Sequence, residues 1–295
     1  MFIDAFLDYL SLEKKYSAHT VLAYKTDLIA FKDYCEVEFD QVDLESINYN
    51  QIRSWIVTLV DQGISNRTIN RKVSSLKTFY KFLQKIEVIT ANPLSKHKAL
   101  KTQKKNEIPF SIKEMENVFK DLNEDDFVSL RNRLIVELFY STGMRRIELI
   151  NIKLSDVDLS SNTVKILGKR NKERIVPLIF AVTQTLKKYI TSRNEIVENN
   201  EYLFITEKGN KIYETLVYRI INRYFSKVST KTKKSPHILR HTFATQLLNQ
   251  GADLNSVKEL LGHSSLASTQ VYTHNNLEQL KQVFNKAHPR SKKKD

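Results

Sequence analysis

Apolar residues in the first hundred positions recur at helical intervals, without the alternation typical of a strand. The clearest series follows Ser65 and predicts a single buried stripe on one helix, formed by Ile69, Val73, Leu76, Tyr80 and Leu83. An earlier helix is predicted after Ser17, whose hydroxyl can cap it. Another is predicted over roughly 51–62, ending at Gly63, where glycine suits a left-handed terminus. Residues 1–95 are therefore predicted to form an all-helical domain.

The pattern changes after Pro93. Residues 96–107 lack an apolar period and predict a basic interdomain linker, which contains Lys96, Lys98, Lys101, Lys104 and Lys105. A second domain is predicted over 108–288, followed by a basic tail at 289–295 that we expect to fray.

Within this second domain, the pattern predicts helices over 112–121 and 128–141 and again from Ala181 onward. Between them, alternating segments at 163–167 and 173–178 predict a β-hairpin. The predicted fold class is mainly α, with one small antiparallel β-sheet in the second domain.

Charge is the first indication of function. The chain has 47 Lys and Arg against 33 Asp and Glu, which leaves a net charge of +14 and favours a polyanionic partner such as nucleic acid. Residues 1–60 contain 5 basic and 10 acidic side chains, whereas residues 61–105 contain 11 and 2. We expect phosphate contacts from the helix after Ser65 and from the linker, through Arg67, Arg71, Lys81, Lys101, Lys104 and Lys105. An ordinary solvated basic surface is the alternative.

Several classes of protein are disfavoured. No stretch approaches the about 18 apolar residues of a membrane span, and acids stand where a signal peptide carries positive charge. Cys35 is the single cysteine, so the simplest expectation is a cytoplasmic protein without intrachain disulfides. The six glycines are scattered, which argues against a P-loop or a dinucleotide-binding fingerprint.

The segment from Ser235 to His241 has the signature of a helix start, with serine at the cap position and Pro236 in the first turn. His237 and Arg240 are three residues apart and are predicted to share a face near the helix N-terminus, where an anion is favoured. His237 and His241 also have the spacing of a zinc-binding helix. The sequence offers neither an intervening glutamate nor a nearby cysteine, so no metal site is predicted.

Two further segments contain candidate chemistry. In the first, Gly143 precedes Arg145 by two positions, and Glu148 is spaced to hold that arginine by a charge-assisted bond. A surface ion pair is the alternative. In the second, Gly262 ends a short predicted helix, and His263 and Tyr272 follow. Taken alone, this second segment could also be a helix-turn-helix that reads DNA.

The order and spacing of these residues resemble those of the tyrosine recombinase/integrase family. An arginine, a hairpin lysine, H-x-x-R, L-G-H and a tyrosine follow in sequence, in surrounding words such as LGKRNKERIVPL, HILRHTFAT and LGHSSLASTQVYTH. The resemblance extends over nearly the whole chain, because 17–24 is similar to the start of the family's N-terminal core-binding domain. One departure is Arg170, which stands where many relatives have glycine.

This resemblance implies a mechanism. Tyr272 would attack a scissile phosphate and form a 3′-phosphotyrosyl bond, with Arg145 and Arg240 stabilising the phosphate oxygens. Lys169 would protonate the departing 5′-oxygen, although Lys172 in the same turn is a rival. His237 would be the acid–base partner of the tyrosine, and His263 would donate a hydrogen bond to the phosphate. No metal, ATP or other cofactor is expected.

The resemblance also implies partners. Relatives recombine double-stranded DNA at a specific site, as four protomers on two duplexes, and a C-terminal segment packs on a neighbouring protomer, here 277–287. The compact length and the Ala-His-Pro-Arg ending resemble the Xer recombinases, which resolve chromosome dimers during cell division. A second Xer recombinase and a septal DNA translocase are then possible partners. The alternatives are a mobile-element integrase or invertase and a non-catalytic DNA-binding protein on the same fold.

Overall fold

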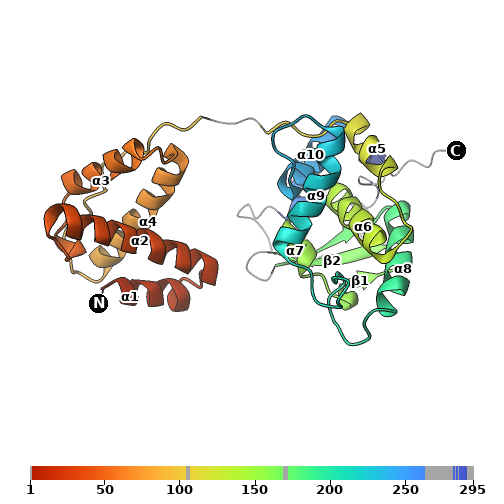
Figure 1. The fold of residues 1–295 in the computed structure, drawn as a ribbon, viewed down its shortest axis with the longest axis horizontal. Helices are drawn as coiled ribbons and strands as arrows, with labels where there is room; N and C mark the ends of the chain where they lie inside the picture. Colours follow the sequence, from red (N-terminus) through yellow and green to blue (C-terminus); the bar gives the residue numbers. More distant parts are fainter. Residues whose placement is uncertain are drawn as a thin grey trace. The chain divides into compact units, whose positions relative to one another are not determined.

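The structure is a computed structural model that describes residues 2–103, 107–168, 172–262, 282, 284 and 286–290. The chain divides into two compact units, residues 1–105 and 106–295, which we call the N-terminal unit and the C-terminal unit (Figure 1). Among the described residues, none of the helices combines the length and the apolar character that a bilayer crossing requires.

The secondary structure in the described part of the N-terminal unit is entirely helical, and turns and irregular chain follow from residue 86. Its elements in chain order are α1 (Phe2–Asp8), η1 (Tyr9–Glu13), α2 (Ala18–Phe39), η2 (Leu44–Ser46), α3 (Tyr49–Asp61) and α4 (Asn66–Lys85). The helix starts predicted after Ser17 and Ser65 are confirmed, since each serine hydroxyl accepts a backbone N–H from the first turn of its helix. Gly63 follows α3 with φ of 74°, the left-handed conformation that its sequence position predicts.

The two faces of α4 differ as the periodicity predicts. All five residues of the apolar stripe are buried, and they pack in one core with Phe6, Phe31 and Trp55. On the opposite side Arg67, Arg71 and Lys81 are exposed.

Asp27 of α2 is a buried charge that the pattern does not predict. It is 1% exposed and accepts hydrogen bonds from both Nη atoms of Arg71, at 2.5 and 2.9 Å, and from the Ser75 hydroxyl at 2.7 Å. Lys72 approaches the same carboxylate at 3.3 Å. Since a buried charge needs such partners, this cluster fastens α2 to α4.

The first residues of the predicted linker are held against α4. Asn70 exchanges two hydrogen bonds with the backbone of Leu100, each 2.9 Å long, and Asn66 donates to the Lys101 carbonyl at 2.8 Å. The chain therefore stays attached to the N-terminal unit as far as Lys101. Lys104 and Lys105 lie outside the described residues.

The C-terminal unit is mostly helical. Its elements are α5 (Ile112–Lys120), α6 (Phe127–Thr142), α7 (Arg146–Ile150), η3 (Leu154–Asp156), β1 (Val157–Asp158), β2 (Thr163–Leu167), β3 (Glu173–Pro177), α8 (Phe180–Asn194), α9 (Glu214–Val228), α10 (Pro236–Asn249) and α11 (Leu254–Leu261). Helix α6 is central and packs against α8, α9 and α10, whereas α7 contacts β2 (Figure 1).

The three strands form one antiparallel sheet in the order β1-β2-β3, with Lys165 opposite Ile175. The predicted hairpin is thus confirmed. The sequence pattern misses β1, because two residues are too few for alternation to be visible. The predicted fold class, mainly α with one small antiparallel sheet, is confirmed.

Part of the predicted C-terminal segment packs within its own unit. Phe284 is fully buried, with its ring 6.4 Å from that of Phe243, and Ala287 is also buried. The ring of His288 lies against Tyr140, whose carbonyl is 3.3 Å from Nε2. These residues therefore belong to the core of the same chain. Packing of 277–287 on a neighbouring protomer stays a prediction.

Candidate active site

The site is built around the turn between α6 and α7. Gly143 ends α6 with φ of 59°, and a Cβ at this position would lie only 2.8 Å from Cδ2 of Leu261 and would also clash with the ring of Phe243. Glycine is therefore required both by the left-handed backbone and by the close packing. The turn places Arg145 at the N-cap of α7.

Glu148 holds Arg145 in two ways. Its carboxylate accepts the backbone N–H of Arg145 at 2.7 Å and the guanidinium Nη1 at 2.7 Å. The Glu148 side chain is 2% exposed, whereas that of Arg145 is 38% exposed. The ion pair indicated by the spacing is present, and it turns one edge of the arginine toward solvent.

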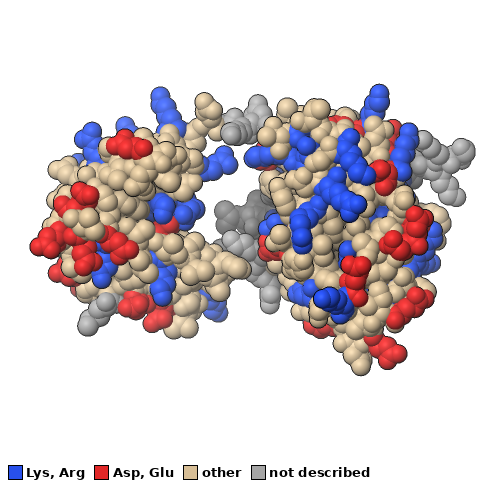
Figure 2. All heavy atoms as spheres, in the orientation of Figure 1, with Lys and Arg blue, Asp and Glu red and all other residues tan. Residues whose placement is uncertain are grey.

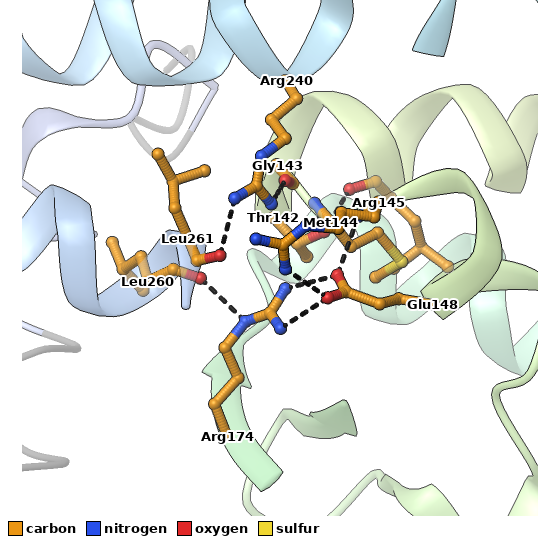
Figure 3. Close-up of polar contacts among 10 residues, drawn as sticks. Thr142, Gly143, Met144, Arg145, Glu148, Arg174, Arg240, Leu260 and Leu261 are labelled. Atoms are coloured by element: carbon orange, nitrogen blue, oxygen red, sulfur yellow. Dashed lines mark hydrogen bonds and ion pairs between the residues drawn. The ribbon is translucent and has the colours of Figure 1, made fainter. Parts of the chain in front are cut away.

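Arg174 of β3 is a site residue that the sequence reasoning missed. It is 5% exposed and donates to Glu148 through two nitrogens, from Nη1 at 3.1 Å and from Nη2 at 2.7 Å. Its Nε donates to the carbonyl of Leu260 at 3.0 Å (Figure 3). A signal for it exists in the sequence, because Arg174 stands two residues before Val176 and therefore points to the buried face of the strand.

The two arginines determine the charge state of Glu148. Burial alone raises the pKa of this carboxyl, but the hydrogen bonds and charge of Arg174, together with the bonds from Arg145, outweigh it and lower the pKa to about 2. Glu148 is therefore a carboxylate at neutral pH.

Arg240 of α10 enters the same site from another side. Its Nη1 donates to the Gly143 carbonyl at 2.6 Å and its Nη2 to the Leu261 carbonyl at 2.7 Å, and it is 8% exposed. Burial, followed by the neighbouring charge of Arg145, lowers the pKa of the guanidinium to about 10. Arg240 thus stays protonated at neutral pH and joins the ends of α6 and α11.

Among the described residues, three guanidinium groups and one carboxylate meet here (Figure 3). The four side chains have a net positive charge, and all of them except the partly exposed Arg145 are buried. Such a site favours an anion with several oxygens, because each guanidinium presents fixed N–H donors to it.

His237 lies apart from this cluster. Its side chain is 76% exposed, and its Nε2 is 3.5 Å from Oε2 of Glu107. Helix α10 begins at Pro236 as predicted, but the Ser235 side chain makes no capping hydrogen bond. Arg240 reaches inward to the two carbonyls, so a common orientation of His237 and Arg240 toward one phosphate stays a prediction.

The remaining predicted residues divide into two groups. Lys169, His263 and Tyr272 lie outside the described residues. Lys172 is described and exposed, and its carbonyl accepts the N–H of Gly168 at 2.8 Å. The basic residues of the N-terminal unit, Arg67, Arg71, Lys81 and Lys101, are all exposed. On the face drawn in Figure 2, the acidic side chains of that unit gather toward one end.

Comparison with known proteins identifies the class. Residues 109–279 match the Phage integrase family, and residues 3–86 match the Phage integrase N-terminal SAM-like domain. The chain belongs to the phage integrase family of tyrosine recombinases.

Individual relatives are similar over nearly the whole chain. Tyrosine recombinase XerC of Staphylococcus aureus (strain USA300 / TCH1516) is 39% identical over 99% of this chain and 98% of its own length. The structure of XerH site-specific recombinase bound to difH substrate, a pre-cleavage complex, is 25% identical and has a TM-score of 0.68, covering 90% of this chain and 80% of that one. A lambda integrase tetramer bound to a Holliday junction is 18% identical with a TM-score of 0.69, covering 92% and 80%.

These findings confirm the predicted family and, with it, the predicted activity of the class. The chain is a site-specific tyrosine recombinase, an enzyme that exchanges DNA strands, and it is of the Xer type.

Proposed function

We propose that this recombinase cuts and rejoins double-stranded DNA at a specific site through a covalent bond between Tyr272 and a 3′-phosphate, and that it resolves chromosome dimers during cell division. The observation that carries the chemistry is the cluster of Arg145, Arg174 and Arg240 around Glu148. The similarity to XerC over the whole chain supports the biological role.

In this proposal the scissile phosphate lies against Arg145 and Arg240. The transition state gathers negative charge on the non-bridging oxygens, and guanidinium groups that are already held in place stabilise it without reorganising. Arg240 is held by two carbonyls and Arg145 by Glu148, so both are preorganised.

Cleavage of one strand needs two proton transfers, and rejoining reverses them. The Tyr272 phenol loses its proton, with His237 as the proposed partner, and its oxygen attacks phosphorus. The bond between phosphorus and the 5′-oxygen then breaks, and that oxygen takes a proton from Lys169, with Lys172 as the rival. His263 donates a hydrogen bond to the phosphate. One phosphodiester is replaced by another ester of similar energy, so the reaction needs no nucleotide hydrolysis.

The proposal extends to partners. A lambda integrase structure of similar fold is a tetramer on a Holliday junction, which supports a synaptic complex of four protomers here. We further propose that the enzyme works in the cytoplasm on chromosomal DNA, with a second Xer recombinase or a septal DNA translocase as possible members of the system.

A covalent adduct tests the chemistry. Cells that contain the wild-type enzyme are lysed under denaturing conditions, and DNA that stays attached to the protein is recovered and sequenced. A duplex of the recovered sequence, nicked beside the cleavage position, is then incubated with purified enzyme. We expect a denaturation-resistant adduct with wild type and with Tyr16→Phe, a matched control at an exposed tyrosine of the N-terminal unit. No adduct is expected with Tyr272→Phe, and an equal yield from that variant would refute the proposed nucleophile.

A further inference from the structure

Arg174 contacts neither the phosphate nor a transferred proton in the chemistry proposed above, yet it is buried deeper than either arginine assigned to the phosphate. Its side chain is 5% exposed, compared with 8% for Arg240 and 38% for the side chain of Arg145. Burying a charge in this way is costly unless every donor finds a partner. Each of its three nitrogens does so, and the partners lie on α7 and at the end of α11.

Two glycines pack against this arginine. A Cβ at Gly262 would lie 3.1 Å from Nη1 and 3.2 Å from Cδ of Arg174, so the backbone of Gly262 lies almost directly on the guanidinium. A Cβ at Gly168 would lie 3.6 Å from the same Nη1 and 3.6 Å from Oε1 of Glu148.

Each of these glycines directly precedes a proposed site residue. Gly168 directly precedes Lys169, and Gly262 directly precedes His263. Glu148, the main partner of Arg174, in turn holds Arg145. Arg174 thus packs against the residue before Lys169, the proposed acid, and against the residue before His263, a proposed phosphate ligand. It also shares the carboxylate of Glu148 with Arg145, a second proposed phosphate ligand.

We propose that Arg174 is a positioning residue for strand cleavage: it aligns the β2–β3 hairpin lysine, the segment that begins at His263, and Arg145 on one phosphate. This inference rests on the proposed function. It requires arginine specifically, because only a planar guanidinium can bind both oxygens of Glu148 while its Nε reaches the Leu260 carbonyl. A lysine would keep the charge but have one nitrogen for three acceptors.

A residue that merely supports folding would lower every activity equally. A positioning residue for the hairpin lysine should matter most when the leaving group needs a proton. This difference can be measured with two nicked duplexes of the recovered sequence, one with the natural 5′-oxygen at the scissile bond and one with sulfur in its place. A thiol has a pKa of roughly 8.5, several units below that of an alcohol, so a 5′-thiolate departs without an acid.

The readout is the ratio of the single-turnover rates of adduct formation on the sulfur and oxygen duplexes. Because both rates come from the same preparation, the folded fraction of a variant cancels in this ratio. With Arg174→Lys we expect adduct formation on the oxygen duplex to fall about 10- to 100-fold, and the sulfur-to-oxygen ratio to rise at least about tenfold. Lys169→Ala and Lys172→Ala remove the two candidate acids one at a time. The variant that lacks the true acid gives the sulfur-to-oxygen ratio that results from its loss.

A matched control is Arg193→Lys, which alters another buried arginine of the C-terminal unit that bonds backbone carbonyls, here those of Asn200, Tyr202 and Leu203. Its ratio should equal the wild-type value even if its stability falls. Arg174→Gln is the second variant, for use if the lysine variant does not fold, and it should raise the ratio in the same way.

The outcomes separate the two proposals. If wild type forms no adduct on either duplex, the proposed function fails. If wild type forms the adduct but the ratio for Arg174→Lys and Arg174→Gln stays at the wild-type value, Arg174 does not position the acid and the inference is overturned. A ratio that rises equally for Arg193→Lys also overturns it, since the effect would then follow any loss of a buried arginine.

Discussion

Each unit of the recombinase contains a buried carboxylate that binds basic side chains, but the two clusters are arranged differently. In the N-terminal unit, Asp27 receives both Nη atoms of Arg71. In the C-terminal unit, Glu148 receives both Nη atoms of Arg174 and only one of Arg145. The Nε and Nη2 atoms of Arg145 donate no hydrogen bond to any described residue.

The difference indicates two roles for a buried carboxylate that pairs with arginine. Both Nη atoms of Arg71 bond Asp27 within the same unit, so the Asp27 cluster fastens one helix to another. Arg174 supplies two of the four hydrogen bonds to Glu148 and Arg145 supplies the others through its backbone N–H and one Nη atom, which leaves part of the Arg145 guanidinium available for a ligand. A buried ion pair by itself is weak evidence of stabilisation, because desolvation offsets much of the attraction. What distinguishes the second cluster is that it orients a partly exposed cation.

The largest effect is expected from Glu148→Gln, which keeps the shape of the side chain but removes the charge that Arg145 and Arg174 share. Both arginines then lose their orientation beside Arg240. We expect the single-turnover rate of adduct formation, measured at saturating DNA, to fall on the order of a thousandfold.

The control for that variant must report on the C-terminal unit, where Glu148 lies. The single tryptophan, Trp55, is buried in the N-terminal unit, so its fluorescence reports unfolding of that unit alone. The far-UV circular dichroism of the native protein, to which the helices of the C-terminal unit contribute, should be the same in Glu148→Gln and in wild type. A rate within tenfold of wild type would show that Glu148 does not orient the phosphate-binding arginine.

Asp27→Asn should lower the stability of the N-terminal unit and leave adduct formation nearly unchanged, the opposite of Glu148→Gln. The substitution leaves Arg71 and Lys72 without their anionic partner, and hydrogen bonds to charged groups contribute about 2 kcal/mol. We therefore expect the free energy of unfolding of the N-terminal unit, measured by Trp55 fluorescence in urea, to fall by about this amount. Adduct formation at saturating DNA should change by less than about threefold. A loss as large as that of Glu148→Gln would remove the distinction between the two clusters.

Local physics accounts for what the sequence predicts well. The stripe of α4 is visible because five apolar residues recur at helical spacing, and the start of α2 is visible because Ser17 caps its own first turn. The hairpin is visible because alternation continues over both strands. The pair Arg145 and Glu148 could be predicted because the two residues are three positions apart on one helical turn.

The parts that could not be predicted depend on partners far away in the chain. Asp27 is buried only because Arg71, 44 residues later, reaches it. Arg174 binds Glu148 across 26 residues and Leu260 across 86. Strand alternation places Arg174 on the inner face but cannot name its partners. Helix spacing likewise could not show that Arg240 reaches inward to the backbone carbonyls of Gly143 and Leu261, which are 97 and 21 residues away in the chain.

The smallest effects test the exposed basic side of α4, which is predicted to contact DNA. Arg67 and Arg71 are both exposed and one helical turn apart, yet only Arg71 has its fork occupied by Asp27. If phosphate contact needs an unoccupied guanidinium, Arg67→Gln should weaken binding to the recovered duplex by up to about tenfold at low salt. It should also reduce the slope of log affinity against log salt by about one. Arg71→Gln should weaken binding by less than about threefold and lower the stability of the N-terminal unit instead. Fluorescence anisotropy across a salt series measures both variants. A larger loss of affinity for Arg71→Gln would mean that the Asp27 cluster orients an arginine for DNA, which is the role proposed for the Glu148 cluster.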